Sequence, residues 1–453
     1  MLIHNAILVD RKGTRRGWLK TDGEIITLVG SGDPTPFDLF DDDEIIDAGG
    51  ACVCPGLIDS HVHFREPGLE HKATIAGESR AALAGGITTV FDMPNTIPAT
   101  TTAEALWEKN KLGQATAATH YRAFFGATPG AMSQLAKLRP GDTPGIKIFL
   151  GTSTGAMSSP SQSELEDVMR WCADHRLPVV VHAEDNDIIA ANTAAAVSRY
   201  GSREAVPVSE HHRIRSAEAC LRSAAAAVEL AHRTGAHLHI AHISTALEAR
   251  ELLDKGPTLG KTVTAETTPM YLDPWLADEA HRDNRHKINP AIKTPGDAEE
   301  LRKAVADGRI DTIATDHAPH LMSEKQGGAL TAASGAPSIQ FAVPMLLNYL
   351  PVELVVSKMS AGVSDVFRLE DYGTLAVGQP ADITVISPSE EYAISESDIL
   401  SPCGWSPFTG RTATYRTKAY VAKAATRHGH AIFAGKDWDK QKKTLILHQQ
   451  TTT

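Results

Sequence analysis

The sequence has few cysteines, few aromatic residues and no uninterrupted apolar run of membrane length. A helix that crosses a membrane needs about 20 consecutive apolar residues, so we expect no membrane partner. The five cysteines among 453 residues are scattered, odd in number and not arranged as paired Cys-X-X-Cys zinc motifs. This excludes a disulfide scaffold and favours reduced thiols in a cytoplasmic protein. The opening residues, "MLIHNAILVDRKG", also lack the pattern of a signal peptide.

Positive charge is in deficit as well. The chain has 44 Lys and Arg residues against 55 Asp and Glu, which gives a formal net charge of −11. Nucleic acids and anionic membranes attract basic surfaces, so we expect no nucleic-acid partner. The length suits one large α/β barrel with an accessory module.

The two ends of the chain differ from its middle. Residues 1–55 and 371–435 contain short β-strand patterns separated by turns, and we expect them to form one small β-sandwich together. Residues 56–370 alternate strand and helix patterns and would form the second domain. Residues 436–453 are predicted to be a polar tail.

The middle contains eight apolar segments rich in β-branched residues, most of them separated by helical stretches rich in Ala, Leu and Glu. They are residues 56–63, 86–95, 121–128, 145–154, 177–185, 236–244, 262–270 and 310–320. Eight such units predict an α/β fold, a (β/α)8 barrel of the TIM type. In that fold the active site lies at the carboxyl ends of the strands, so residues capable of chemistry should lie there.

Polar residues do lie in or at the ends of most of these segments. In "GLIDSHVHFREPG", residues 56–68, an apolar strand stops at two histidines, which share one face because side chains alternate along a strand. The residues, in strand order, are His61, His63, Asn95, Lys147, His182, His242 and Asp316. Strand three offers no comparable ligand.

Strand parity separates candidate ligands from structural residues. In strand six we choose His242, at the strand end, and assign His237 and His239 to structural positions on the other face. In strand eight we choose Asp316 and place His317 on the opposite face, in a supporting role.

Histidine and carboxylate ligands favour zinc or a similar divalent ion. Lys147 is the unusual member of the set, because burial beside cations would lower the pKa of its amine. A neutral amine can react with carbon dioxide to give an anionic carbamate that bridges two metals. The alternative is a lysine paired with Glu184 or Glu266.

Longer motifs resemble dihydroorotases of the amidohydrolase superfamily across nearly the whole chain. "DSHVHFREPG", "ESRAALAGGITTVFDMPNT", "GIKIFLGTSTG", "VVVHAED", "HHRIRSAEAC", "LHIAHISTALE", "KINPAIK", "ATDHAPH" and "SPCGWSPFTG" carry the resemblance. The Arg-Glu-Pro-Gly after the His-X-His pair, "MPNT" and "SPCGWSPF" are its more specific parts.

The resemblance implies a binuclear zinc site. His61, His63 and Asp316 would bind one Zn²⁺ and His182 and His242 the other, with carboxylated Lys147 and a hydroxide between them. Asp316 would also be the catalytic acid and base. The substrate residues would be Arg65, Asn95, Asn289 and His320.

The activity implied by the resemblance is the reversible hydrolysis of dihydroorotate to N-carbamoyl-aspartate in pyrimidine biosynthesis, by a homodimer. The "KIFLGTSTG" segment is also similar to dihydropyrimidinases, hydantoinases and allantoinases. Arg65 favours an acidic substrate, because its planar guanidinium matches a carboxylate. A non-catalytic structural partner of another pyrimidine enzyme is the third hypothesis.

Two segments depart from the family pattern or leave alternatives open. Met270 and Tyr271 stand where many relatives have histidines, which affects the expected chemistry near strand seven but not the metal ligands. Residues 322–340 are rich in Gly, Ala and Ser and would form either a lid over the substrate or an ordinary surface loop.

Overall fold

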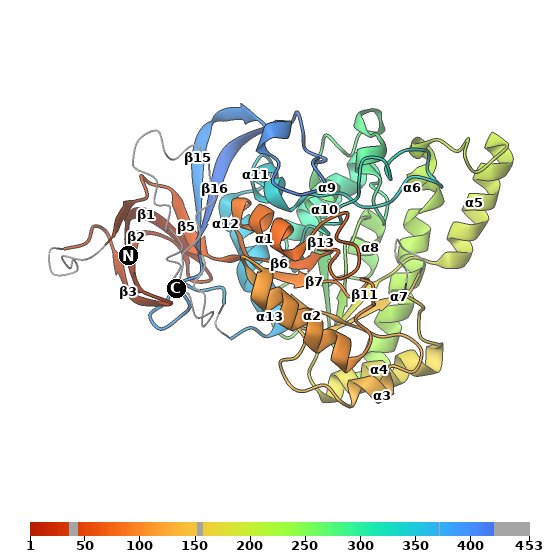
Figure 1. Ribbon diagram of the computed structural model, residues 1–453, viewed down its shortest axis with the longest axis horizontal. Helices are drawn as coiled ribbons and strands as arrows, with labels where there is room; N and C mark the ends of the chain where they lie inside the picture. The colour runs from red at the N-terminus through yellow and green to blue at the C-terminus, as the bar shows by residue number, and fades with distance from the viewer. Residues whose placement is uncertain (36–43, 152–156, 371, 421–453) are drawn as a thin grey trace, which may run out of the picture.

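The protein consists of a strand-and-helix barrel and a smaller β-sheet unit that contains the N-terminus (Figure 1). This computed structural model describes residues 1–35, 44–151, 157–370 and 372–420. The barrel confirms the predicted (β/α)8 fold, and each of the eight predicted segments contains a strand. The barrel strands are β6 (Leu57–Val62), β7 (Ile87–Asp92), β8 (His120–Ala123), β9 (Phe125–Gly126), β10 (Ile146–Phe149), β11 (Val179–His182), β12 (Leu238–Ile240), β13 (Val263–Thr267) and β14 (Thr312–Ile313).

All neighbouring barrel strands pair in parallel. One set runs β6-β7-β8 and the other β14-β13-β12-β11-β10-β9. Strands β8 and β9 are separated by Phe124 alone and together fill the third strand position. On the other side, a parallel bridge between Val62 and His317 closes the barrel. The carboxyl ends of β6 and β14 are therefore adjacent, which places His61 and His63 beside Asp316.

Helices follow most of the barrel strands and surround them (Figure 1). They are α1 (Ile75–Ala84), α2 (Ala103–Thr116), α3 (Met132–Leu135), α4 (Gln162–Asp174), α5 (Asn186–Tyr200), α6 (His211–Ile214), α7 (Ala217–Thr234), α8 (Ala246–Glu251), α9 (Pro269–Leu272), α10 (Pro295–Ala306), α11 (Ala342–Leu346), α12 (Val352–Val356) and α13 (Gly362–Phe367). A π-helical turn, Ser357–Ala361, joins the last two.

Local sequence explains where the long helices begin and end. The side chain of Ser216 accepts a hydrogen bond from the backbone N–H of Ala219 and begins α7, and Gly235 ends it with a φ of 72°. Helix α4 begins with a reciprocal capping box between Ser161 and Glu164. Such caps satisfy backbone groups that have no partner inside the helix.

The small unit is built from both ends of the chain, as predicted. Its strands are β1 (Leu2–Asp10), β2 (Gly13–Asp22), β3 (Ile25–Ser31), β4 (Ile45–Asp47), β5 (Cys52–Pro55), β15 (Ile383–Ala393) and β16 (Thr412–Tyr420). They form a seven-stranded sheet in the order β16-β15-β5-β1-β2-β3, with β4 on β1. Strand β5 pairs with β1 on one side and β15 on the other, and so joins the two ends of the chain.

Gly56 alone separates the sheet from the first barrel strand. A Cβ atom at this position would lie 2.1 Å from Oγ1 of Thr88, so only glycine allows the two units to approach this closely. The domain limits at residues 55 and 371 stay a prediction, and residue 371 lies outside the described residues. The predicted polar tail, residues 436–453, lies outside the described residues.

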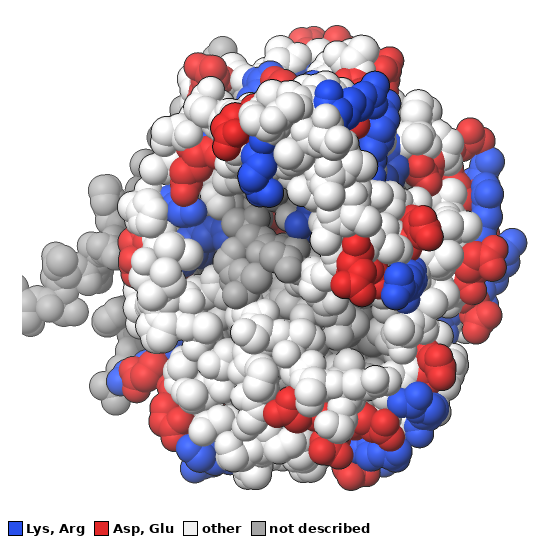
Figure 2. Space-filling view, turned by 90° about the vertical axis from the view of Figure 1, so that its right-hand side faces the viewer, with Lys and Arg blue, Asp and Glu red and all other residues white. Residues whose placement is uncertain are grey.

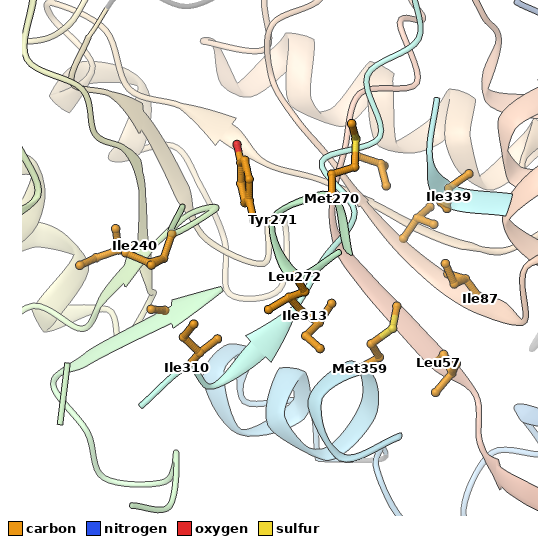
Figure 3. Close-up of a cluster of buried hydrophobic side chains, with 14 of the residues drawn as sticks. Leu57, Ile87, Ile240, Met270, Tyr271, Leu272, Ile310, Ile313, Ile339 and Met359 are labelled. Carbon is orange, nitrogen blue, oxygen red and sulfur yellow. The ribbon is translucent and has the colours of Figure 1, made fainter. Parts of the chain in front are cut away.

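The main hydrophobic core fills the space between the barrel strands and their helices. Figure 3 shows part of it, with apolar side chains from β6, β7, β12 and β14 beside those of α9 and the π-helical turn. Burial of one such aliphatic side chain contributes about 1.5–3 kcal/mol to folding. Met270 and Tyr271 belong to this core. Tyr271 also donates its hydroxyl hydrogen to the carbonyl oxygen of Pro290 at 2.6 Å.

Acidic and basic side chains are interspersed on the face in Figure 2, and a hollow near its centre has Lys or Arg side chains at its rim. No helix among the described residues is long and apolar enough to span a membrane.

Candidate functional site

The carboxyl ends of the barrel strands surround one polar cavity with about 390 Å³ of empty volume, part of it open to solvent. Nine of the ten predicted site residues line it, and the tenth, His320, lies behind Arg65. The lining residues are His61, His63, Arg65, Asn95, Lys147, Phe149, His182, His242, Asn289, Asp316, Ala318, Ser334 and Gly335. The fold therefore brings together residues that are up to 274 positions apart in the sequence (from 61 to 335).

His61, His63 and Asp316 form a group that could hold a metal ion, because their ligand atoms lie within 4.8 Å of one another. Oδ1 of Asp316 is 3.1 Å from Nε2 of His63 and 3.4 Å from Nε2 of His61. Burial alone would raise the pKa of Asp316, but the two histidines lower it well below its usual range. Burial lowers the pKa of His63 to about 4. The cluster thus presents an ionised carboxylate and a neutral His63 at neutral pH, which are the forms that bind metals.

The other nitrogen of each histidine is held by a partner behind the cluster. Nδ1 of His63 lies 2.7 Å from Oδ1 of Asn95, and Nδ1 of His61 contacts Oε1 of Glu266. Each Nδ1 therefore donates its hydrogen to an oxygen, and each Nε2 faces Asp316 in the cluster. Partners of this kind orient metal ligands and set their tautomer.

Sequence reasoning missed Glu266 as an orienting residue and considered it only as a partner for Lys147. Its side chain is 1% exposed, and its second oxygen lies 3.4 Å from Nε2 of His239. The available signal was a lone carboxylate within the short, otherwise uncharged β13. His239 is structural, as parity predicted: its Nδ1 lies 2.9 Å from Oγ1 of Thr264.

A second group of candidate ligands lies beside the first, with the ring of His242 5.3 Å from that of His61. Nδ1 of His182 is 3.0 Å from Nε2 of His242, and His242 has a φ of 43° at the end of its strand. Burial lowers the pKa of both imidazoles, and for His242 the reduction is large. Among the described residues, Nδ1 of His242 is a buried nitrogen without a hydrogen-bond partner. Glu184 lies behind this group, close to Nε2 of His182 and paired with Arg215.

Lys147 projects into the same cavity, with its Nζ 5.2 Å from the centre of the Phe149 ring. Its side chain is fully buried, and its Nζ makes no hydrogen bond with any described residue. Burial lowers the pKa of Lys147 to about 8. The alternative ion pair is not seen, because Glu184 binds Arg215 and His182, while Glu266 binds His61 and His239. Buried nitrogens of the cavity that lack a hydrogen-bond partner among the described residues, such as Nζ of Lys147 and Nδ1 of His242, fit a site completed by a bound group.

Arg65 forms a basic part of the cavity wall. Its Nε donates to the carbonyl oxygen of Pro319 at 2.9 Å, and its Nη2 donates to Nε2 of His320 at 3.2 Å. Within the described ranges, no carboxylate forms an ion pair with it. Burial lowers the pKa of Arg65 to about 10, so the side chain stays cationic at neutral pH. Burial and the cations around it, Arg65 first, lower the pKa of His320 to about 2 and keep that ring neutral.

Asn289 reaches the cavity from the other side. Its Oδ1 lies 3.1 Å from Nε2 of His211, which also contacts the carbonyl oxygen of Ile288 at 2.9 Å. This contact leaves the amide nitrogen of Asn289 available to the cavity. His317 plays a supporting part: its Nε2 binds Glu78 at 2.9 Å and its Nδ1 accepts from the backbone of Ile339.

Comparisons with known proteins show the family of the chain. A model of the amidohydrolase family matches residues 52–402. A dihydroorotase from Halobacterium salinarum is 34% identical over 443 residues, covering 96% of this chain and 98% of the relative. A dihydroorotase from Bacillus subtilis is 32% identical over 445 residues, covering 95% and 99%.

Solved structures share the fold. An L-hydantoinase (dihydropyrimidinase) from Arthrobacter aurescens has a TM-score of 0.85 at 24% identity, covering 95% of this chain and 97% of that one. A D-hydantoinase (dihydropyrimidinase) from a Thermus species has a TM-score of 0.80 at 23% identity, covering 95% and 96%. With its family match, its curated relatives and its cavity of histidines, lysine and aspartate, the chain belongs to the amidohydrolase family.

Proposed function

We propose that the protein is a dihydroorotase, which hydrolyses the cyclic amide of dihydroorotate reversibly to N-carbamoyl-aspartate in pyrimidine biosynthesis. The observation that carries the proposal is Arg65, a buried cation without a carboxylate partner among the described residues, in the cavity that holds the His61, His63 and Asp316 cluster. A substrate with a carboxylate beside its reacting amide suits both features. The names of the curated relatives support the same activity.

The donor set supports two divalent metal ions, with zinc favoured by its nitrogen and oxygen ligands. His61, His63 and Asp316 would hold one ion, and His182 and His242 the other. Carbon dioxide would carboxylate Nζ of Lys147, and the resulting carbamate would lie between the two ions. The amine would then no longer be a buried group without a partner. Such ions lower the pKa of water and polarise a carbonyl group when they are bound.

The protein's own residues account for binding and proton transfer. The guanidinium of Arg65 can bind the substrate carboxylate through its planar fork, with Asn289 beside the ring. Asp316 can accept a proton from the attacking water and return it to the amide nitrogen as the ring C–N bond breaks. The carbonyl carbon gains the water oxygen and becomes the new carboxylate. His320 holds the Arg65 guanidinium in place.

Hydantoinase, dihydropyrimidinase or allantoinase activity is the second candidate, because the solved structures with this fold bear the first two names. Dihydropyrimidines and hydantoins lack the carboxylate that would neutralise Arg65. A panel of dihydroorotate, dihydrouracil, hydantoin and allantoin separates these activities. A non-catalytic partner role would require a protein that binds no metal and turns over none of them.

The first test combines metal content and dihydroorotate hydrolysis on one preparation, with wild type beside Lys147→Ala. The proposal is supported if wild type holds about two metal ions per chain and turns over dihydroorotate, and if Lys147→Ala strongly reduces both metal content and turnover. Full metal occupancy without turnover would move the assignment to the uncharged substrates. We also propose a cytoplasmic homodimer, and light scattering of the purified protein would measure its mass.

A further inference from the structure

Two buried lysines beside the cavity bind backbone oxygens instead of carboxylates. Lys325 has no exposed surface, and its Nζ donates to the carbonyl oxygens of Lys287 at 2.9 Å, Ala333 at 2.9 Å and Gly335 at 2.8 Å. These three bonds use all three hydrogens of an ammonium group. The ring of Trp405 lies 5.7 Å from the same nitrogen.

Lys287 binds the same segment from another side. Its Nζ donates to the carbonyl oxygen of Ala332 and to Oγ of Ser334, the latter at 2.9 Å. Its own carbonyl oxygen accepts the backbone N–H of Gly335 at 2.9 Å. In the part of the chain that the structure describes, neither lysine has a carboxylate within ion-pair distance. Burial of a charge without a counter-ion is costly, so this arrangement needs a reason.

The segment that both lysines hold, residues 332–335, is part of the cavity wall. Ser334 and Gly335 line the cavity together with the histidines. Gly335 has a φ of 138°, and a Cβ atom at this position would lie 2.7 Å from the carbonyl oxygen of Ala318 and 3.0 Å from Cδ2 of His320. The segment therefore packs directly against His320, the residue that holds Arg65.

We propose that Lys325, together with Lys287, is a positioning residue that fixes residues 332–335 as a rigid wall of the substrate cavity and keeps His320 against Arg65. The inference rests on the proposed function for its substrate. It assigns residues 322–340 to a fixed wall rather than to a closing lid. The lysines act through this wall and do not touch the reacting atoms.

The test compares Lys325→Met with Lys358→Met. Lys358 is a matched control because its buried Nζ also donates to a backbone oxygen, that of Ile310 at 2.6 Å. Ile310 precedes β14, so this bond lies at the end of the barrel opposite the cavity. Both variants lose a buried lysine, but only one loses contacts to the cavity wall.

For Lys325→Met we expect faster amide hydrogen exchange in peptides that cover residues 326–336. We also expect KM for dihydroorotate to rise about tenfold or more, because misplacement of binding groups weakens substrate alignment. The kcat should change less than about threefold and metal content should stay at the wild-type level, since no proposed ligand is touched. Lys358→Met should show neither the local exchange change nor the KM change.

Equal exchange of residues 326–336 and equal KM in both variants would overturn the proposal. If Lys325→Met does not fold, Lys287→Met removes the bonds to Ala332 and Ser334 and decides the question by the same readouts. If wild type does not hydrolyse dihydroorotate, the proposed function fails. The exchange difference between the Lys325 and Lys358 variants then supports or overturns the fixed wall by itself.

Discussion

Nδ1 of His63 donates a hydrogen bond to Oδ1 of Asn95 at 2.7 Å, which ties the first strand of the barrel to the loop that follows the second. This bond fixes the imidazole so that its Nε2 faces Asp316. The resemblance assigned Asn95 to the substrate alone. The geometry shows that its carbonyl oxygen is already used by a metal-ligand candidate.

Asn95→Ala should therefore weaken metal binding as well as substrate binding. Loss of an orienting partner typically reduces metal affinity about 10- to 100-fold. Titration of the apoprotein with zinc against a competing chelator measures this affinity. Wild-type zinc affinity together with a raised KM would mean that Asn95 serves the substrate only.

Glu266→Gln should lower metal affinity without a large change of shape. The amide cannot supply the negative charge that holds the Nδ1 hydrogen of His61, so we expect a loss of zinc affinity of about 10- to 100-fold. His239→Gln is a control, because it perturbs the other oxygen of Glu266 but leaves His61 in place. The hypothesis fails if the control loses as much zinc as Glu266→Gln.

Arg65→Met should reduce kcat/KM for dihydroorotate mainly through KM. Hydrogen bonds to a charged group contribute about 1.5–3 kcal/mol, which corresponds to roughly 10- to 150-fold in kcat/KM. Arg65→Lys should retain only part of the wild-type kcat/KM, because a lysine lacks the planar fork of the guanidinium. Steady-state kinetics on dihydroorotate and dihydrouracil are the measurement. An equal loss on both substrates would contradict a carboxylate-binding role.

Glu248, a buried residue that does not line the cavity, should make the stability of the protein depend on pH. Burial raises its pKa to about 7, despite hydrogen bonds from Oγ1 of Thr245 and the backbone of Ser244. The folded state therefore binds the proton more tightly than the unfolded chain does. The contribution of protonated Glu248 to the free energy of unfolding is complete below the unfolded pKa of about 4.3. This contribution is lost as pH rises towards 7.

Glu248→Gln should remove this part of the pH dependence. Between pH 4.5 and pH 8, the free energy of unfolding of wild type should fall relative to that of the variant by up to about 3 kcal/mol. Urea unfolding at both pH values measures it. A difference that does not change with pH would show that Glu248 is ionised in the folded protein throughout.

The barrel and most of the residues around the cavity could be predicted from the amino-acid sequence alone. Alternation along a strand places His61 and His63 on one face, and the strand ends of a parallel barrel meet at one edge. Parity also distinguishes His242, which lines the cavity, from His239, which is not among its lining residues. These inferences depend on local periodicity, which a single sequence displays.

The hydrogen-bond partners that orient the cavity residues are seen only in the folded protein. Glu266 reaches His61 across 205 positions, and Thr315 reaches Asp59 across 256. No local pattern encodes such pairs, because they arise only when the barrel closes and the seventh and eighth strand positions come close to the first. The bonds from Lys325 to the cavity wall belong to the same class: a lysine in a polar loop suggests solvent, and only its packing makes it buried.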